Sequence, residues 1–177
     1  MQQVRGWSAL ETGLAIFPGG LLVPLLAPRV APLVQRFGPS RLIGVGLASA
    51  GVGYALFLPI GLDSGYLAAM LPTFLLTGLG FGLAYGPLNI AATNGVAPEE
   101  QGLAGGLVNT SFQFGGALVL AVATAVNNAS AGSGGSPQAL MDGFHAAIVV
   151  SLVVAVLGVA VTLLRRRGGG VPCPEPA

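Results

Sequence analysis

The chain has 177 residues, of which 53% are hydrophobic and only 7% are charged, whereas charged residues make up about 25% of an average soluble domain. So few charges cannot cover a water-facing surface, which excludes a soluble globular protein and favours contact with a lipid bilayer. The formal net charge of +1 provides no basic footprint, so we expect no nucleic-acid partner.

Five stretches of the chain are apolar and long enough to cross a membrane, since about 20 residues span the roughly 30 Å of hydrocarbon. In chain order they cover residues 8–33, 42–62, 66–93, 103–126 and 143–164. Residues 168–177 are expected to form a disordered cytoplasmic tail. The sequence therefore predicts an all-α, polytopic membrane bundle of about five transmembrane helices.

Local signals mark where the predicted helices begin and end. Ser8 and Glu11 have the spacing of a capping box, in which each side chain accepts a hydrogen bond from a backbone N–H of the first turn. Pro98, followed by two glutamates, suits the positive N-terminal end of the fourth helix. Residues 127–136 are rich in Gly, Ser and Asn, which predicts a flexible loop before the fifth helix.

The arginines predict the orientation of the chain, because cytoplasmic loops carry an excess of basic residues. Arg29, Arg36 and Arg41 flank the first connection, and residues 165–167 are three arginines after the last span. With five spans, both groups fall on one side of the membrane, and Arg5 falls on the other. We therefore expect the N-terminus outside and the C-terminus in the cytoplasm.

Glycines recur in the third and fourth predicted helices, and Gly78, Gly82 and Gly86 follow one another at four-residue spacing. Without a Cβ, the backbones of two membrane helices can approach closely, so this pattern favours tight helix packing. A sliding surface in an alternating-access cycle is the alternative interpretation. The glycines assigned to helix packing are Gly78, Gly82, Gly86, Gly102, Gly106, Gly115 and Gly116.

Prolines inside the predicted spans indicate kinked helices, because each proline removes a backbone hydrogen bond. Kinks occur in transporters and in static bundles alike, so they do not separate these two classes. The prolines are Pro18, Pro24 and Pro28 in the first span, Pro59 late in the second, and Pro72 and Pro87 in the third.

Polar side chains at membrane depth need partners in protein or water, since lipid offers none. Tyr85 and Asn89 share one side of the third helix, and Asn109 and Gln113 share one side of the fourth. Both pairs suit the lining of an aqueous cavity. They suit interhelical hydrogen bonds equally well, and the residues alone leave both interpretations open.

Several kinds of chemistry have no candidate residues in the sequence. No Asp, Glu or Lys lies in the middle of a predicted span, although proton-coupled transport needs an ionisable group at depth. His145 is the only histidine, near the outer interface, and Cys173 is the only cysteine, so no internal disulfide can form. Without a metal-ligand cluster or a catalytic set, we expect no enzyme, no metal and no cofactor.

Four segments of the chain resemble, in order, those of one transporter family. The first is 1–14, with Gly6, Ser8 and Gly13, and the second is 33–41, with Arg36, Gly38 and Arg41. The third is 82–87 followed by 96–107, with Pro87 and Pro98, and the fourth is 109–116, with Asn109, Gln113, Gly115 and Gly116. The chain is thereby similar to the fourteen-helix drug–proton antiporter branch of the major facilitator superfamily. Pro32 and Gln35 depart from its cytoplasmic loop motif, and Phe112 from its helix motif.

The resemblance implies that residues 1–167 form part of the C-terminal half of a major facilitator fold. It implies export of amphipathic drugs or small molecules by proton antiport in the full-length protein, in a bacterial inner membrane. Arg36, Gly38 and Arg41 would form a cytoplasmic gating loop. The first, third and fourth helices would border the substrate cavity, which favours as cavity-lining residues Tyr85, Asn89, Asn109 and Gln113.

Two other interpretations of the chain stay open. It could be a non-transporting membrane subunit that pairs with another helical membrane protein through its glycine-rich faces. It could also be a non-functional truncated gene product. In the family interpretation, its partners are the lipid bilayer, a small-molecule substrate, and either the missing N-terminal half or a partner membrane protein.

Overall fold

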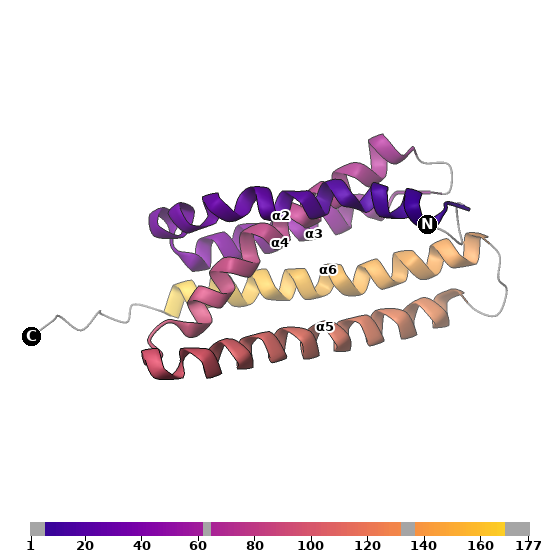
Figure 1. Cartoon of the computed structure of the whole chain (residues 1–177). Coiled ribbons are helices and arrows are strands. Elements are labelled where there is room, and N and C mark those ends of the chain that lie inside the picture. The colour runs from indigo at the N-terminus through magenta and orange to yellow at the C-terminus, as the bar shows by residue number, and fades with distance from the viewer. Residues whose placement is uncertain (1–5, 62–64, 132–136, 169–177) are drawn as a thin grey trace, which may run out of the picture.

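Five long helices follow one another along the chain (Figure 1). The computed structural model describes residues 6–61, 65–131 and 137–168, and within these residues it contains no strand. All five helices are long and apolar enough to cross a membrane, which confirms the predicted all-α membrane bundle. They are α2 (Ala9–Phe37), α3 (Pro39–Phe57), α4 (Leu71–Thr93), α5 (Gln101–Ala131) and α6 (Pro137–Gly168).

The capping box predicted for the first helix is confirmed. The Oγ atom of Ser8 accepts a hydrogen bond from the backbone N–H of Glu11 at 3.2 Å, and Glu11 Oε2 accepts from the N–H of Ser8 at 2.8 Å. Two of the backbone N–H groups that a helix start leaves without partners are thereby satisfied. Helix α2 therefore begins at Ala9, next to the predicted start.

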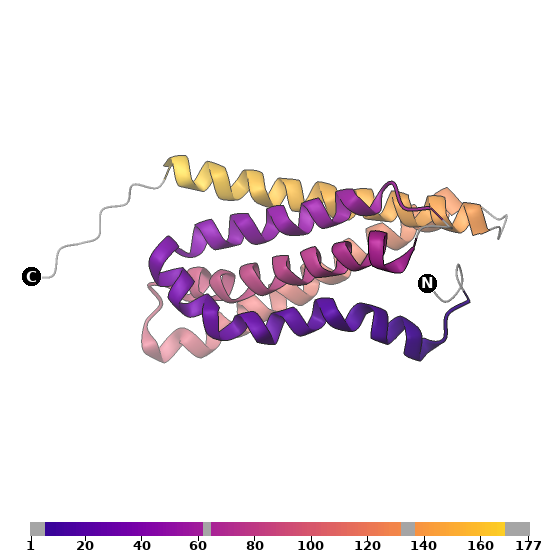
Figure 2. The same cartoon turned by 90° about the horizontal axis from the view of Figure 1, so that it is seen from above.

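The connection between α2 and α3 is a single residue, Gly38. Its φ of +78° favours glycine, and its N–H donates to the carbonyl oxygen of Val34 at 2.8 Å. Helix α2 therefore continues to Phe37, past the predicted end of the span, and α3 begins at Pro39. Four prolines lie inside α2, which follows a bent course in Figure 2.

Helix α3 ends earlier than predicted, at Phe57, so the expected kink at Pro59 inside a span is wrong. Pro59 has no N–H with which to continue the helix. The carbonyl oxygen of Ala55 instead accepts a hydrogen bond from the N–H of Leu58 at 3.2 Å, which closes a turn. Pro59 therefore lies in the connection that leads to the next helix.

The third predicted span, 66–93, is covered by a short π-helix, η1 (Tyr66–Met70), followed directly by α4. Pro72 lies in the first turn of α4, where a missing N–H costs little, and Pro87 lies inside the helix. A 3₁₀ turn, η2 (Pro98–Glu100), leads into α5.

Helices α5 and α6 are longer than the apolar stretches that predicted them. Residues 127–131 belong to α5, so the flexible loop expected there is wrong for these five residues. Adding a residue to an existing helix costs much less free energy than starting a new helix. This explains why the largely polar segment 127–131 extends α5. Gly168, the first residue of the predicted tail, is the last residue of α6. The rest of the predicted loop, 132–136, and the rest of the predicted tail, 169–177, lie outside the described residues.

Helix α4 packs mainly against α3 and α2, and α6 packs against α3 and α5. Figure 1 shows α4 running obliquely from the α2–α3 layer toward the start of α5. Helix α5 meets α4 over a shorter length than it meets α6. The molecule therefore has a tightly packed group, α2–α3–α4, and a second pair, α5–α6, joined to it chiefly through α3.

Glycines allow the close approach inside the α2–α3–α4 group. A Cβ built on Gly80 would lie 2.6 Å from the carbonyl oxygen of Gly46 on α3. Gly78 faces the backbone of Gly19 on α2 in the same way. A larger residue at these positions would force the helices apart, so glycine is what permits backbone-to-backbone contact here.

Candidate functional site

A cavity of about 590 Å³ is bounded by residues from all five long helices. Small-molecule pockets in proteins range from about 300 to 1,000 Å³ and are mostly apolar. The residues that line this cavity are mostly apolar, and no charged side chain of the described residues is among them. Its polar side chains carry hydroxyl groups: Tyr54 on α3, Thr77 and Tyr85 on α4, and Ser151 on α6.

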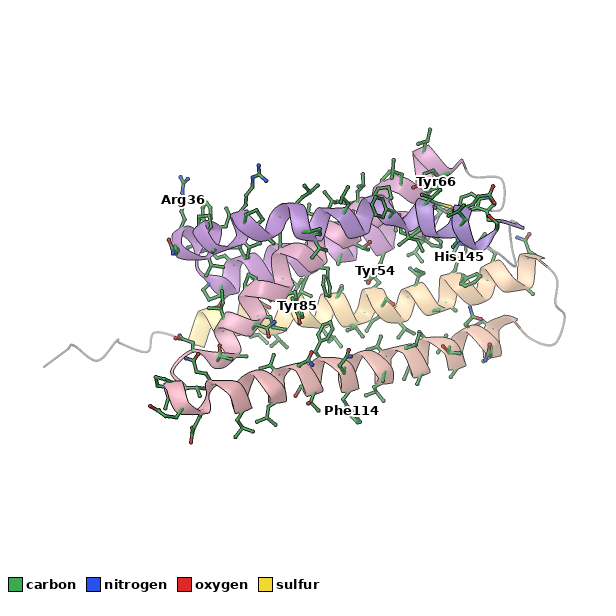
Figure 3. All side chains as sticks on the ribbon, in the orientation of Figure 1. Arg36, Tyr54, Tyr66, Tyr85, Phe114 and His145 are labelled. Carbon is green, nitrogen blue, oxygen red and sulfur yellow. The ribbon has the colours of Figure 1, made fainter. Side chains whose placement is uncertain are left out.

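Two of these hydroxyls are occupied within their own helices. Thr77 Oγ1 donates to the carbonyl oxygen of Thr73 at 2.8 Å, and Ser151 Oγ donates to that of Ala147 at 3.5 Å. The hydroxyls of Tyr54 and Tyr85 have no hydrogen-bond partner among the described residues. Figure 3 shows Tyr54 between the α2–α3–α4 group and α6, whereas Tyr85 on α4 packs against Phe112 of α5. The cavity therefore offers two free phenol groups to a ligand.

An aromatic cluster of Phe81, Tyr85 and Phe112 forms one wall of the cavity. The rings of Phe81 and Tyr85 stack with centroids 5.2 Å apart and planes inclined by 15°, as expected for residues four apart on α4. Phe112 on α5 meets Tyr85 edge to face, with centroids 5.5 Å apart. These distances lie within the range of favourable aromatic pairs.

Of the four residues predicted to line the cavity, the structure brings only Tyr85 to it. Asn89 lies one turn further along α4, where its Nδ2 donates to the backbone carbonyl oxygen of Tyr85 at 2.9 Å. That bond stays within the helix and does not join two helices. The predicted pair on α4 thus contains one cavity residue and one residue that bonds to its own backbone.

Asn109 and Gln113 are exposed on α5, and neither lines the cavity that this chain forms. Within the described residues, neither side chain makes a hydrogen bond. The residue of this turn that does reach the cavity is Phe112. Contact between substrate and this amide pair stays a prediction about a surface that the described helices leave uncovered.

The predicted packing glycines behave differently on α4 and α5. A Cβ on Gly82 would lie 3.1 Å from Leu26 Cδ1, and one on Gly86 would lie 3.4 Å from Val30 Cγ1, so this stripe faces α2. On α5 no atom lies within 4 Å of a Cβ built at the predicted positions, so packing there stays a prediction. These positions are Gly102, Gly106, Gly115 and Gly116.

The three residues predicted for the gating loop lie at the α2–α3 corner. Arg36 is in the last turn of α2, with its guanidinium 5.2 Å from the ring centroid of Phe37. Arg41 is exposed in the first turn of α3, and Gly38 is the only residue between the helices. In the described part of the chain, neither arginine is paired with a carboxylate.

His145 has a structural partner that the sequence did not reveal. Its Nε2 lies 2.9 Å from the carbonyl oxygen of Ile60, in the segment after α3. Since a carbonyl can only accept, Nε2 carries the proton. The imidazole also meets the ring of Phe57 at 6.3 Å. The histidine thereby ties α6 to the end of α3.

Tyr54, Phe81 and Phe112 are cavity residues that sequence reasoning missed. The spacing of four between Phe81 and Tyr85 was a usable signal, because it places both rings on one side of α4. Tyr54 is the single tyrosine of the predicted charge-free span 42–62, and Phe112 stood out only as a departure from a family motif. Among the described residues, no group of three His, Cys, Asp or Glu side chains could hold a metal ion.

Comparison with known proteins identifies relatives over most of the chain. Residues 1–120 match the family model of the Major Facilitator Superfamily. The cephamycin export protein CmcT of Amycolatopsis lactamdurans is 38% identical over 174 residues, which cover 94% of this chain and 35% of that protein. The puromycin resistance protein pur8 of Streptomyces alboniger is 35% identical over 164 residues, which cover 88% of this chain and 33% of that protein.

A third relative, the lincomycin resistance protein of Streptomyces lincolnensis, is 32% identical over 123 residues, covering 69% of this chain and 25% of that protein. No solved structure matches the chain. The chain spans about a third of the length of the first two relatives. The family match, the identity across most of the chain and the five apolar helices together show that this multi-pass membrane protein belongs to the Major Facilitator Superfamily.

Proposed function

We propose that this chain is the membrane-embedded C-terminal part of a drug exporter that moves amphipathic small molecules out of the cell by proton antiport. The observation that carries the proposal is the cavity of about 590 Å³, which is apolar and uncharged along its described lining. It also contains the hydroxyls of Tyr54 and Tyr85, which have no hydrogen-bond partner among the described residues. An amphipathic molecule gains from burying apolar surface there and can accept hydrogen bonds from the phenols.

The relatives support export as the activity and antibiotics as the substrate class. One is named for cephamycin export, and two are named for resistance to puromycin and lincomycin. Transport in this family requires a second half that closes the substrate site and rocks against the first. This chain spans about a third of the first relatives' length, and we assign that second half to the full-length exporter of the proposal.

Proton coupling needs an ionisable group at membrane depth. The middle sections of the five described helices carry no Asp, Glu or Lys, so we assign the coupling group to the part of the exporter outside this chain. The uncovered side of α5, with its glycines and its pair Asn109 and Gln113, is the surface we assign to contact with that part or with the substrate.

We assign the chain to the inner membrane, with the N-terminus outside and the C-terminus in the cytoplasm, and the arrangement of basic residues supports this orientation. The α2–α3 corner carries Arg36 and Arg41, and it lies at the same end of the bundle as the C-terminal end of α6, where residues 165–167 are arginines (Figure 1). This end faces the cytoplasm, because basic residues are retained on that side.

A chimaera tests the proposed function. This chain replaces the matching segment of the cephamycin export protein of A. lactamdurans, and uptake of labelled cephamycin is measured in everted membrane vesicles with an imposed proton gradient. We expect gradient-dependent uptake that a protonophore abolishes, and no uptake when the segment is deleted. A stably inserted chimaera with no more uptake than the deletion would contradict the proposal.

A further inference from the structure

We propose that Phe81, Tyr85 and Phe112 form a subsite for a flat, uncharged aromatic group of the ligand. This inference rests on the proposed exporter function and adds to it the chemical class that this part of the cavity selects. It follows from the geometry of the three rings, from the charge of the cavity lining and from the way α4 and α5 meet.

The rings form a corner with two surfaces at a steep angle. Phe81 and Tyr85 lie nearly parallel, inclined by 15°. The ring of Phe112 is inclined by 62° to Phe81 and by 71° to Tyr85. A flat ring placed in such a corner can stack on one surface and present its edge to the other, and both arrangements are favourable for aromatic pairs.

The rings keep a large free surface although they contact one another. Phe81 is 44% exposed, Tyr85 39% and Phe112 40%, and all three line the cavity. Many apolar side chains of this membrane chain are exposed to a similar degree, so exposure alone does not mark a ligand site. What singles these rings out is that all three also line the cavity, where part of their surface can meet a ligand.

The absence of charge along the described lining sets the class of the ligand group. A charged group that enters this cavity loses its hydration, and no lining carboxylate, guanidinium or ammonium of the described residues replaces it. An uncharged aromatic group loses little hydration and gains ring contacts. The hydroxyl of Tyr85 has no partner among the described residues, so it can donate a hydrogen bond to a ligand that carries an acceptor beside its ring.

Two fluorescent probes that share one ring system test this subsite. N-phenyl-1-naphthylamine is neutral, and 1-anilinonaphthalene-8-sulfonate carries a sulfonate on the same skeleton. Each is titrated into the 177-residue chain in lipid nanodiscs, and the signal of empty nanodiscs is subtracted. We expect saturable binding of the neutral probe and no saturable binding of the sulfonate.

Ring-removing variants locate the probe. Tyr85→Leu and Phe112→Leu keep apolar bulk, and each is expected to weaken neutral-probe binding about 3- to 10-fold, the equivalent of one aromatic pair. Tyr85→Phe keeps the ring and is expected to bind close to the parent chain. The matched control is Phe114→Leu on the same helix, because Phe114 is 72% exposed, does not line the cavity and points away from it in Figure 3.

Circular dichroism establishes that each variant keeps its helix content before its affinity is compared. The subsite is refuted if Phe112→Leu and Tyr85→Leu bind the neutral probe as tightly as Phe114→Leu does, because the rings would then only join α4 to α5. Tighter saturable binding of the sulfonate would refute the uncharged class. The chimaera could export cephamycin while the chain shows neither selective binding of the neutral probe nor weaker binding in the ring-removing variants. That result would refute the subsite and would not contradict the exporter function.

Discussion

Gly46 on α3 and Gly80 on α4 approach so closely that a Cβ built on either residue would lie 2.6 Å from the carbonyl oxygen of the other. Ser49 on α3 donates its hydroxyl to the carbonyl oxygen of Leu76 on α4 at 2.9 Å, about one turn from this contact. Backbone contact and a hydrogen bond thus fix α3 against α4, and these two helices form the wall that carries Tyr54 and Tyr85.

Replacing Gly46 with alanine is expected to destabilise the chain by about 1–3 kcal/mol, since the added methyl group must displace α4. The measurement is thermal unfolding of the purified chain in detergent, followed by circular dichroism. Gly105→Ala is the matched control, because a Cβ on this helical glycine meets no atom within 4 Å. Equal melting temperatures for the two variants would contradict the described α3–α4 contact.

His145→Ala is expected to cost about 1 kcal/mol, because it removes the hydrogen bond to the carbonyl oxygen of Ile60 and leaves that oxygen without this donor. His145→Gln offers an amide N–H at a similar reach and is expected to recover most of the loss. The same unfolding measurement compares the two variants. If alanine and glutamine were equally stable, the bond would not join α6 to the end of α3.

Much of the fold could be predicted because its signals are local. The Ser8–Glu11 capping box and the apolar length of each helix depend only on neighbouring residues. The errors arose at helix ends. Residues 127–131 extend α5 because elongation is inexpensive, while the missing N–H of Pro59 helps to end α3 early. Neither outcome can be decided from apolar composition alone.

The candidate site was less predictable, because a membrane helix is apolar on the side that faces lipid and also on the side that faces this cavity. Sequence reasoning therefore followed polarity, which selected Asn109 and Gln113, whereas Phe112 is the residue of that turn that lines the cavity. The contact between Phe112 and Tyr85 joins two helices, so no local pattern contains it. Tyr85 was selected for its polar hydroxyl and does line this cavity, while its contact with substrate stays a prediction.

The amide pair on α5 gives a prediction with two readouts. Because Asn109 and Gln113 are exposed and make no hydrogen bond within the described residues, replacing both with alanine should change the stability of the chain by less than about 0.5 kcal/mol. In the cephamycin-exporting chimaera, the same double variant is expected to reduce efflux. Unchanged efflux would remove the pair from the proposed substrate-contact surface.

The proposed orientation predicts which residues an impermeant reagent reaches in intact cells. In a Cys173→Ser background, a cysteine is placed at Ser130, at the end of α5, or at Ser40, at the α2–α3 corner; both serines are exposed. A membrane-impermeant maleimide should label Ser130→Cys in intact cells and Ser40→Cys only after permeabilisation. The reverse labelling pattern would place the N-terminus in the cytoplasm.

The central claim is that substrate passes through the cavity bounded by the five helices. The most direct test is to fill this cavity with a large side chain. Gly20 lines the cavity and Gly13 does not, although both lie on α2 and neither Cβ would meet an atom within 4 Å. In the cephamycin-exporting chimaera, Gly20→Phe is expected to abolish efflux, while Gly13→Phe keeps it, with both proteins equally abundant in the membrane. Full efflux by the Gly20→Phe variant would contradict the claim.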